Sequence, residues 1–178
     1  MLSLETNLDS VITLITDRLE NINFEELTAL QASTVMGEMR KRIHVEGKDA
    51  NGGQIGNYST GYIKVRTGLY NDSKATKTGI VKTAGVFSKG KNKGEARPKY
   101  QRDASSKVIL SLTRQMENSM ILVPFENGCG IGYSSEENFN KSQWCEETYG
   151  KKKIFYLTQE ERDLAVLKGQ EYINETLK

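Results

Sequence analysis

The strongest constraint on the fold is a pair of apolar segments on either side of a turn motif. The segments are Ser119–Phe125 and Cys129–Ser134, and Glu126-Asn127-Gly128 lies between them. Asn-Gly is the strongest short-range hairpin signal, because a type I′ turn needs positive φ at both central residues. The sequence therefore predicts two antiparallel strands joined as a β-hairpin.

Two helices are predicted after the hairpin. Asn140 and Gln143 have the spacing of a capping box, and Gly150 fits the position just beyond a helix end, so a short helix is expected over 140–150. Residues 158–161 (Thr-Gln-Glu-Glu) form a second such motif and open a final helix. Trp144 in the short helix is predicted to anchor the sheet in the core, with an interface contact as the alternative.

Two further helices are predicted before residue 46. Over 7–22 the apolar residues recur at three- and four-residue steps, as in an amphipathic helix. These residues are Leu8, Val11, Ile12, Ile15, Leu19 and Ile22. A second helix is predicted from Phe24, after an Asn23–Glu26 capping box, to about Val45, where Gly47 stops it.

The second of these helices is expected to bury part of its face against a neighbouring subunit. Threonine, alanine and methionine occupy more than half of its apolar stripe, so the helix packs loosely by itself. The residues assigned to this interface are Leu27, Val35, Met39 and Ile43. With the hairpin and the later helices, this predicts an α+β fold in one domain over 1–178.

Residues 61–107 differ in character and are predicted to form a long basic loop or extended arm with one or two short strands. Twelve basic residues against three acidic ones give this segment a charge of +9, and the chain total of +2 leaves −7 for the rest. The basic residues are Lys64, Arg66, Lys74, Lys77, Lys82, Lys89, Lys91, Lys93, Arg97, Lys99, Arg102 and Lys107.

Three interpretations of this arm stay open. It is a nucleic-acid arm whose lysines neutralise phosphates, an assembly arm that orders on an acidic neighbouring subunit, or a plain solvated loop. The acidic remainder of the chain favours the assembly arm, because copies in a ring can then pair arm to body.

Catalysis and metal binding are poorly supported, and no catalytic, cofactor-binding or metal-ligating residues are assigned. His44 is the only histidine and is expected to be solvated or to cap a helix end. Zinc needs about four ligands, which one histidine and two separate cysteines do not supply. Cys129 and Cys145 are expected to be free, buried thiols. No apolar run approaches the roughly 20 residues that span a bilayer, so no membrane contact is expected.

The order of motifs resembles the tailed-bacteriophage virion morphogenesis and tail-completion family. The motifs are Leu112-Thr113 followed by Asn118-Ser119, Ile131-Gly132-Tyr133 ending the hairpin, the short helix, Tyr149-Gly150, and the 154–161 run (Ile-Phe-Tyr-Leu-Thr-Gln-Glu-Glu). A helix ending near Arg42-Ile43 and the glycine-rich turn Asp49-Ala50-Asn51-Gly52 are similar to a second feature of that family. The resemblance covers roughly residues 24–176.

The resemblance implies a non-enzymatic structural virion protein. Such proteins form homo-oligomeric rings, commonly of six or twelve copies, at the head–tail junction or neck, and join portal or connector proteins to the tail. The expected location is the virion, after assembly in the host cytoplasm. The expected partners are further copies and other connector, portal or tail proteins, and the arm can also face genomic DNA in the neck channel. The alternative is a basic-arm nucleic-acid-binding protein.

Overall fold

The computed structural model describes residues 7–67, 74–75, 81–82, 86–87, 89–96, 100 and 102–177. The fold is α+β, as predicted. Its helices are α1 (Leu8–Glu20), α2 (Phe24–His44), α3 (Thr60–Thr67), α4 (Gln115–Asn118), α5 (Glu136–Thr148) and α6 (Gln159–Thr176). Its strands are β1 (Lys74–Ala75), β2 (Val81–Lys82), β3 (Met120–Phe125) and β4 (Gly128–Tyr133), paired as β1–β2 and β3–β4.

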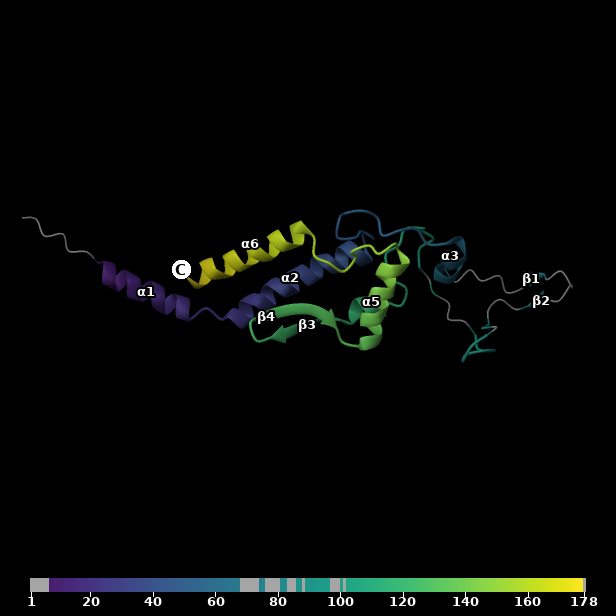
Figure 1. Cartoon of the computed structure of the whole chain (residues 1–178), viewed down its shortest axis with the longest axis horizontal. Coiled ribbons are helices and arrows are strands. Elements are labelled where there is room, and N and C mark those ends of the chain that lie inside the picture. Colours follow the sequence, from purple (N-terminus) through teal and green to yellow (C-terminus); the bar gives the residue numbers. More distant parts are fainter. Residues whose placement is uncertain are drawn as a thin grey trace, which may run out of the picture.

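The long helix α2 is the centre of an elongated molecule. Helix α6 lies alongside α2, and the β3–β4 hairpin packs against α2 as well (Figure 1). Helix α1 projects beyond this body at one end, while α3 and the short β1–β2 pair lie toward the other end. The two-helix and hairpin body therefore stands between two outlying segments.

Capping side chains set the starts of α2 and α6 where the sequence predicted them. The Asn23 Oδ1 accepts hydrogen bonds from the backbone N–H groups of Glu25 and Glu26, both at 3.1 Å. At α6 the Thr158 Oγ1 accepts from the Glu161 N–H, and the Glu161 carboxylate accepts from the Thr158 N–H. Both bonds of the second capping box are thus made.

Helix α5 begins earlier than predicted. Its N-cap is Ser135, whose Oγ accepts from the Asn138 N–H at 3.3 Å, so the capping box assigned to Asn140 is wrong. The serine lies directly after the hairpin and accepts from one of the free N–H groups of the first turn before Asn140 is reached. The predicted end is correct, because Gly150 adopts a φ of +82° just beyond the helix.

The hairpin is present, but its turn differs from the predicted one. Phe125 pairs with Gly128, so Glu126 and Asn127 are the two turn residues and neither has positive φ. The expectation of a type I′ turn centred on Asn127 and Gly128 is therefore wrong. The pairs alternate in hydrogen bonding, and the Ser134 N–H donates to the Ser119 oxygen at 2.8 Å. Pro124 consequently occupies a pair that exchanges no backbone bonds, where its missing N–H costs nothing.

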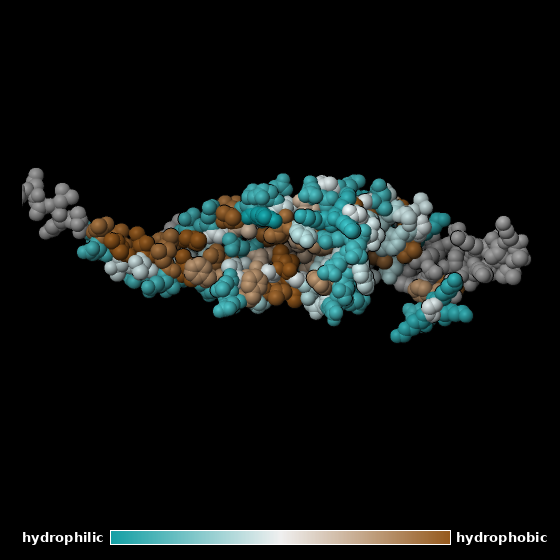
Figure 2. All heavy atoms as spheres, viewed as in Figure 1, coloured by the Kyte–Doolittle hydropathy of each residue, from teal (hydrophilic) through white to brown (hydrophobic). Residues whose placement is uncertain are grey.

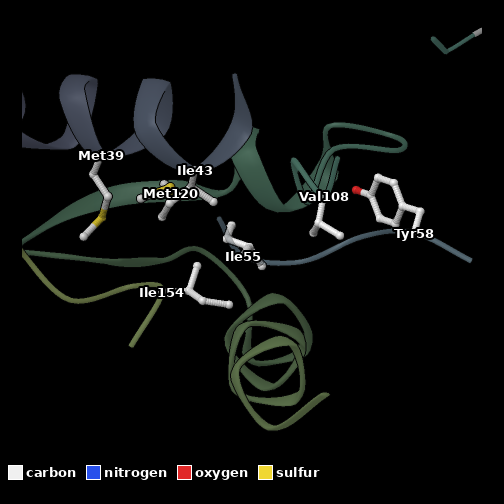
Figure 3. Packing of buried hydrophobic residues seen from close by; sticks show 7 residues of the cluster. All are labelled: Met39, Ile43, Ile55, Tyr58, Val108, Met120 and Ile154. Carbon is white, nitrogen blue, oxygen red and sulfur yellow. The ribbon is translucent and has the colours of Figure 1, made fainter. Parts of the chain in front are cut away.

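The core joins α2 and β3 to three irregular segments. Its residues are Met39, Ile43, Ile55, Tyr58, Val108, Met120 and Ile154 (Figure 3). Ile43 and Ile154 have no exposed surface, and Ile55 is 1% exposed. The Asp49 Oδ1 accepts from the Asn51 and Gly53 N–H groups and closes the turn that brings Ile55 back to α2.

The four residues assigned to a subunit interface on α2 are buried inside the chain. Leu27, Val35, Met39 and Ile43 are between 0% and 7% exposed. Helix α6 and the hairpin of the same chain pack against α2. Contact of these four residues with a neighbouring subunit stays a prediction.

Part of the predicted arm belongs to the body. Residues 60–67 form α3, residues 106–108 run beside 56–58, and the Arg102 N–H donates to the Arg66 oxygen at the end of α3. The Tyr58 N–H donates to the Ser106 oxygen at 2.6 Å, and the Val108 N–H donates to the Gly56 oxygen at 3.0 Å. The prediction of a loop over all of 61–107 is therefore wrong at both ends. Backbone pairing and the burial of Arg66 make these ends part of the body.

Candidate assembly surfaces

Helix α1 exposes all of its large apolar side chains. No residue of α1 is buried, and these side chains are between 43% and 60% exposed. They are Leu8, Val11, Ile12, Leu14, Ile15 and Leu19. In Figure 2 the apolar surface covers α1 and continues onto the adjoining part of the body.

This exposure sets α1 apart from an ordinary surface helix. Single exposed apolar residues are normal on soluble proteins, but a contiguous apolar patch marks an interaction site. A 13-residue helix is also marginal by itself, since most helical stability in proteins comes from packing of the apolar face. The Arg18 guanidinium donates to the Leu177 oxygen and holds the base of α1 at the end of α6. Within the described residues, nothing buries the apolar face of the rest of α1.

An open apolar groove of about 610 Å³ lies on the body. Ala32, Val35 and Met39 of α2 form one side of it. The other contributors come from the hairpin, from α5, from the 155–157 segment and from α6: Phe125, Cys129, Ile131, Phe139, Phe155, Leu157 and Ala165. We refer to this feature as the α2–hairpin groove.

Phe125 forms an exposed edge of this groove. Its side chain is 62% exposed, and its ring lies against the backbone of β4. A Cβ atom at Gly128 or Gly130 would come within 3.2 or 3.1 Å of that ring. The alternating glycines of β4 therefore let the ring of Phe125 lie flat along the strand.

A second hollow of about 740 Å³ lies beside α3 and α5 and is lined by aromatic residues. Tyr58, Tyr62, Trp144 and Tyr149 all contribute to it. Burial raises the pKa of Tyr149 to about 12, so its hydroxyl stays protonated at neutral pH.

Trp144 is 59% exposed, so its predicted role as a core anchor is wrong. Asn138 and Ser142 are the residues of α5 that are buried, at 4% and 5% exposed. Trp144 lies at a different helical phase and meets the aromatic hollow. The alternative interpretation, an interface contact, stays a prediction.

The structure places the described basic residues of the predicted arm in different settings. Lys64, Lys89, Lys91 and Lys93 are exposed, and Lys107 is half-buried where it bridges to Asn57. Lys74 and Lys82 are backbone register partners in the β1–β2 pair. Lys77, Arg97 and Lys99 lie outside the described residues.

Arg66 and Arg102 are engaged within the chain. Arg66 has no exposed surface, and its guanidinium donates to the Ser111 oxygen at 2.8 Å and lies 4.5 Å from the centre of the Tyr58 ring. Asp103 is 3.3 Å from the same guanidinium. The Arg102 Nε donates to the Leu112 oxygen at 3.0 Å. Arg66 is therefore unavailable to an external partner, and its assignment to the interaction arm is wrong because it closes α3 onto the body.

His44 is buried, which corrects the prediction of a solvated or capping side chain. It is 4% exposed, and its Nδ1 lies 3.3 Å from the Ile109 oxygen. Burial lowers the pKa of His44 below its ordinary value of 6.5, while Glu117 acts in the opposite direction. The neutral imidazole is thus the form that the fold accommodates.

We expect the burial of His44 to make stability fall with pH below about 6.5, where the unfolded chain binds a proton that the folded chain does not. The expected slope is at most about 1.4 kcal/mol per pH unit for one proton, and it ends at the pKa of the folded state. Urea unfolding between pH 7.5 and 5 measures it. The His44→Gln variant should show a shallower dependence, and identical profiles for both proteins would contradict this explanation.

Within the described part of the chain, histidine, cysteine, aspartate and glutamate side chains never gather in groups of three that could hold a metal ion. Cys129 and Cys145 are free thiols and half-buried. Among the described helices, none has the length and apolar composition that crossing a bilayer requires.

Comparison with known proteins returned no matching family model, no matching curated protein and no matching solved structure.

Proposed function

We propose that this protein is a structural component of a tailed-phage virion that acts through protein–protein contacts and catalyses no reaction. The exposed apolar face of α1 carries the proposal. A helix that buries none of its six large apolar side chains is costly to maintain in water unless a partner covers it.

The order of the sequence motifs supports a role at the head–tail junction in particular. The long α2 helix, the hairpin, the short helix and the capped final helix follow one another in the order that resembles the phage tail-completion family. We therefore place the protein in a homo-oligomeric ring of six or twelve copies at the head–tail junction. It joins portal or connector proteins to the tail, after assembly in the host cytoplasm.

Electron microscopy of virions purified from infected cells that produce this protein tests the role. The expected result is density at the neck into which the α2–α6 pair and the hairpin fit, repeated around the tail axis. Antibody labelling of the same virions should decorate the neck after mild disruption. Absence of the protein from intact virions, with normal amounts in the infected cell, would contradict a structural role at this position.

A nucleic-acid contact is the second candidate, and three lysines favour it. Lys89, Lys91 and Lys93 are exposed, and none has a carboxylate within ion-pair distance among the described residues. Gel shift with mixed-sequence DNA over a salt series measures this contact. Steeply salt-dependent binding that falls when all three lysines become glutamine would support it, since each neutralised phosphate adds about one unit to the salt slope.

A further inference from the structure

We propose that α1 of one copy binds in the α2–hairpin groove of a second copy. This inference rests on the proposed assembly function and names the contact that would perform it. The two surfaces belong to the same chain, both are apolar, and each lacks a covering element within the described residues.

Helix α1 presents its apolar residues as one continuous seam. Leu8, Ile12, Ile15 and Leu19 follow at alternating steps of four and three residues, which places them on one side of the helix. Over 13 residues the seam is roughly 20 Å long, from a rise of about 1.5 Å per residue. This is the pattern with which an amphipathic helix enters an apolar groove.

The groove provides the complementary surface. Small and flexible side chains, Ala32, Met39 and Ala165, line it beside the larger Phe125 and Phe155. None of the residues that line the groove is charged, so an entering helix would disrupt no ion pair there. Isoleucine and leucine side chains can therefore enter without leaving a charge uncompensated.

The chain's own α1 is held away from its own groove. Helix α1 ends at Glu20 and α2 starts at Phe24, so only three residues connect them. Ile22 in this connection is 8% exposed, and its N–H donates to the Leu19 oxygen at 3.2 Å. Arg18 also bonds the last turn of the chain. Folding back would break these contacts, which favours a second copy as the occupant.

The size of the contact favours a closed assembly over an isolated pair. Six half-exposed side chains offer on the order of 300 Å² of apolar surface, if full burial of one such side chain removes about 60–120 Å². A standard interface takes about 800 Å² from each partner. One helix in one groove is therefore weak. Because each copy has one helix and one groove, head-to-tail contacts that close into a ring add up without needing any new surface.

Thiol cross-linking between two differently tagged forms tests the proposal, because Cys129 already lies in the groove as a free thiol. The donor carries Ile15→Cys with Cys129→Ser and Cys145→Ser, so its only thiol is on α1. The acceptor carries Cys145→Ser alone and keeps Cys129. After mixing, a short bismaleimide should shift both forms to the summed mass of donor and acceptor. Ile15 is exposed, so its replacement leaves the body intact.

A matched donor with Asp17→Cys in place of Ile15→Cys is the control, because residue 17 lies on the opposite side of α1. It should give no donor–acceptor product. Pairs formed by the Ile15→Cys donor alone would mean that α1 binds α1, and would overturn the proposal. An internal link in a chain that carries both Ile15→Cys and Cys129 would mean that α1 closes on its own groove, with the same consequence. Failure to link at all would also overturn it.

The cross-linking result and the proposed position in the virion can fail independently of each other. Cross-linking uses purified protein, so a positive result with no protein in the phage neck would leave the helix-in-groove contact standing and remove the proposed location. A negative result with neck density present would do the reverse.

Discussion

Replacing Ile12 and Ile15 together by glutamate is expected to leave the protein monomeric while its body keeps its full stability. Both side chains are about half exposed and belong to a helix with no buried residue. Exposed substitutions of this kind change the free energy of unfolding by about 0.5 kcal/mol at most. In an assembled state the same positions face an apolar surface, where an unpaired carboxylate costs several kcal/mol.

Light scattering on a sizing column measures the mass, and urea unfolding measures the stability of the same samples. The matched control is Ser10→Glu with Thr13→Glu, which adds two carboxylates on the opposite side of α1 and should leave the oligomer intact. An oligomer that survives the Ile12 and Ile15 changes would contradict the role of α1. A loss of more than about 1 kcal/mol in unfolding free energy would mean that α1 is packed on its own body.

Replacing Arg42 by alanine is expected to cost about 3–5 kcal/mol of unfolding free energy, which is the range for removing one partner of a buried ion pair. The Arg42 Nε lies 2.7 Å from the Glu161 Oε1, and both side chains are less than 10% exposed. The same guanidinium donates to the Ile154 oxygen at 3.1 Å and to the Tyr156 oxygen at 2.8 Å.

The loss is large because Arg42 joins three parts of the chain. It connects α2 to the start of α6 and holds the 154–156 segment between them. The substitution leaves the Glu161 carboxylate buried without its partner and removes the donor to three backbone oxygens, those of Lys48, Ile154 and Tyr156. Urea unfolding measures the change, with the exposed neighbour Lys41→Ala as the control. A cost below about 1 kcal/mol for Arg42→Ala would show that solvent reaches Glu161 in the folded protein.

Local signals in the sequence predicted the elements they specify directly. The Asn23 and Thr158 caps fixed the starts of α2 and α6 because a side-chain acceptor near free N–H groups acts within one turn. The hairpin followed from two apolar runs around a short turn. The turn type was wrong, because strand register is set by packing along the whole hairpin and shifted the turn by one residue.

These local signals could not predict the tertiary contacts. Charge composition groups Arg66 with the exposed lysines of the arm. It does not show that the Arg66 guanidinium packs on the Tyr58 ring and donates to the Ser111 oxygen. Ile55 and Val108 contribute to the core from segments without periodicity. Trp144 does not anchor the core, because the polar Asn138 and Ser142 take the buried side of α5.

The apolar surface of α1 shows the same limit. Helical periodicity predicts that a helix has an apolar side, but it does not say which element covers that side. Both α1 and α2 have an apolar stripe, and the sequence pattern does not say which of the two stripes is covered within the chain. The sequence pattern assigns the subunit interface to α2, against which α6 and the hairpin of the same chain pack, whereas nothing among the described residues covers α1.

The most direct test of self-association is native mass spectrometry of the unmodified protein over a range of concentrations. The expected spectrum contains one closed oligomer of fixed copy number, which dissociates to monomers on dilution with no open-ended series between them. A monomer at every concentration, with the amides of α1 exchanging hydrogen as fast as an unfolded peptide, would contradict the account.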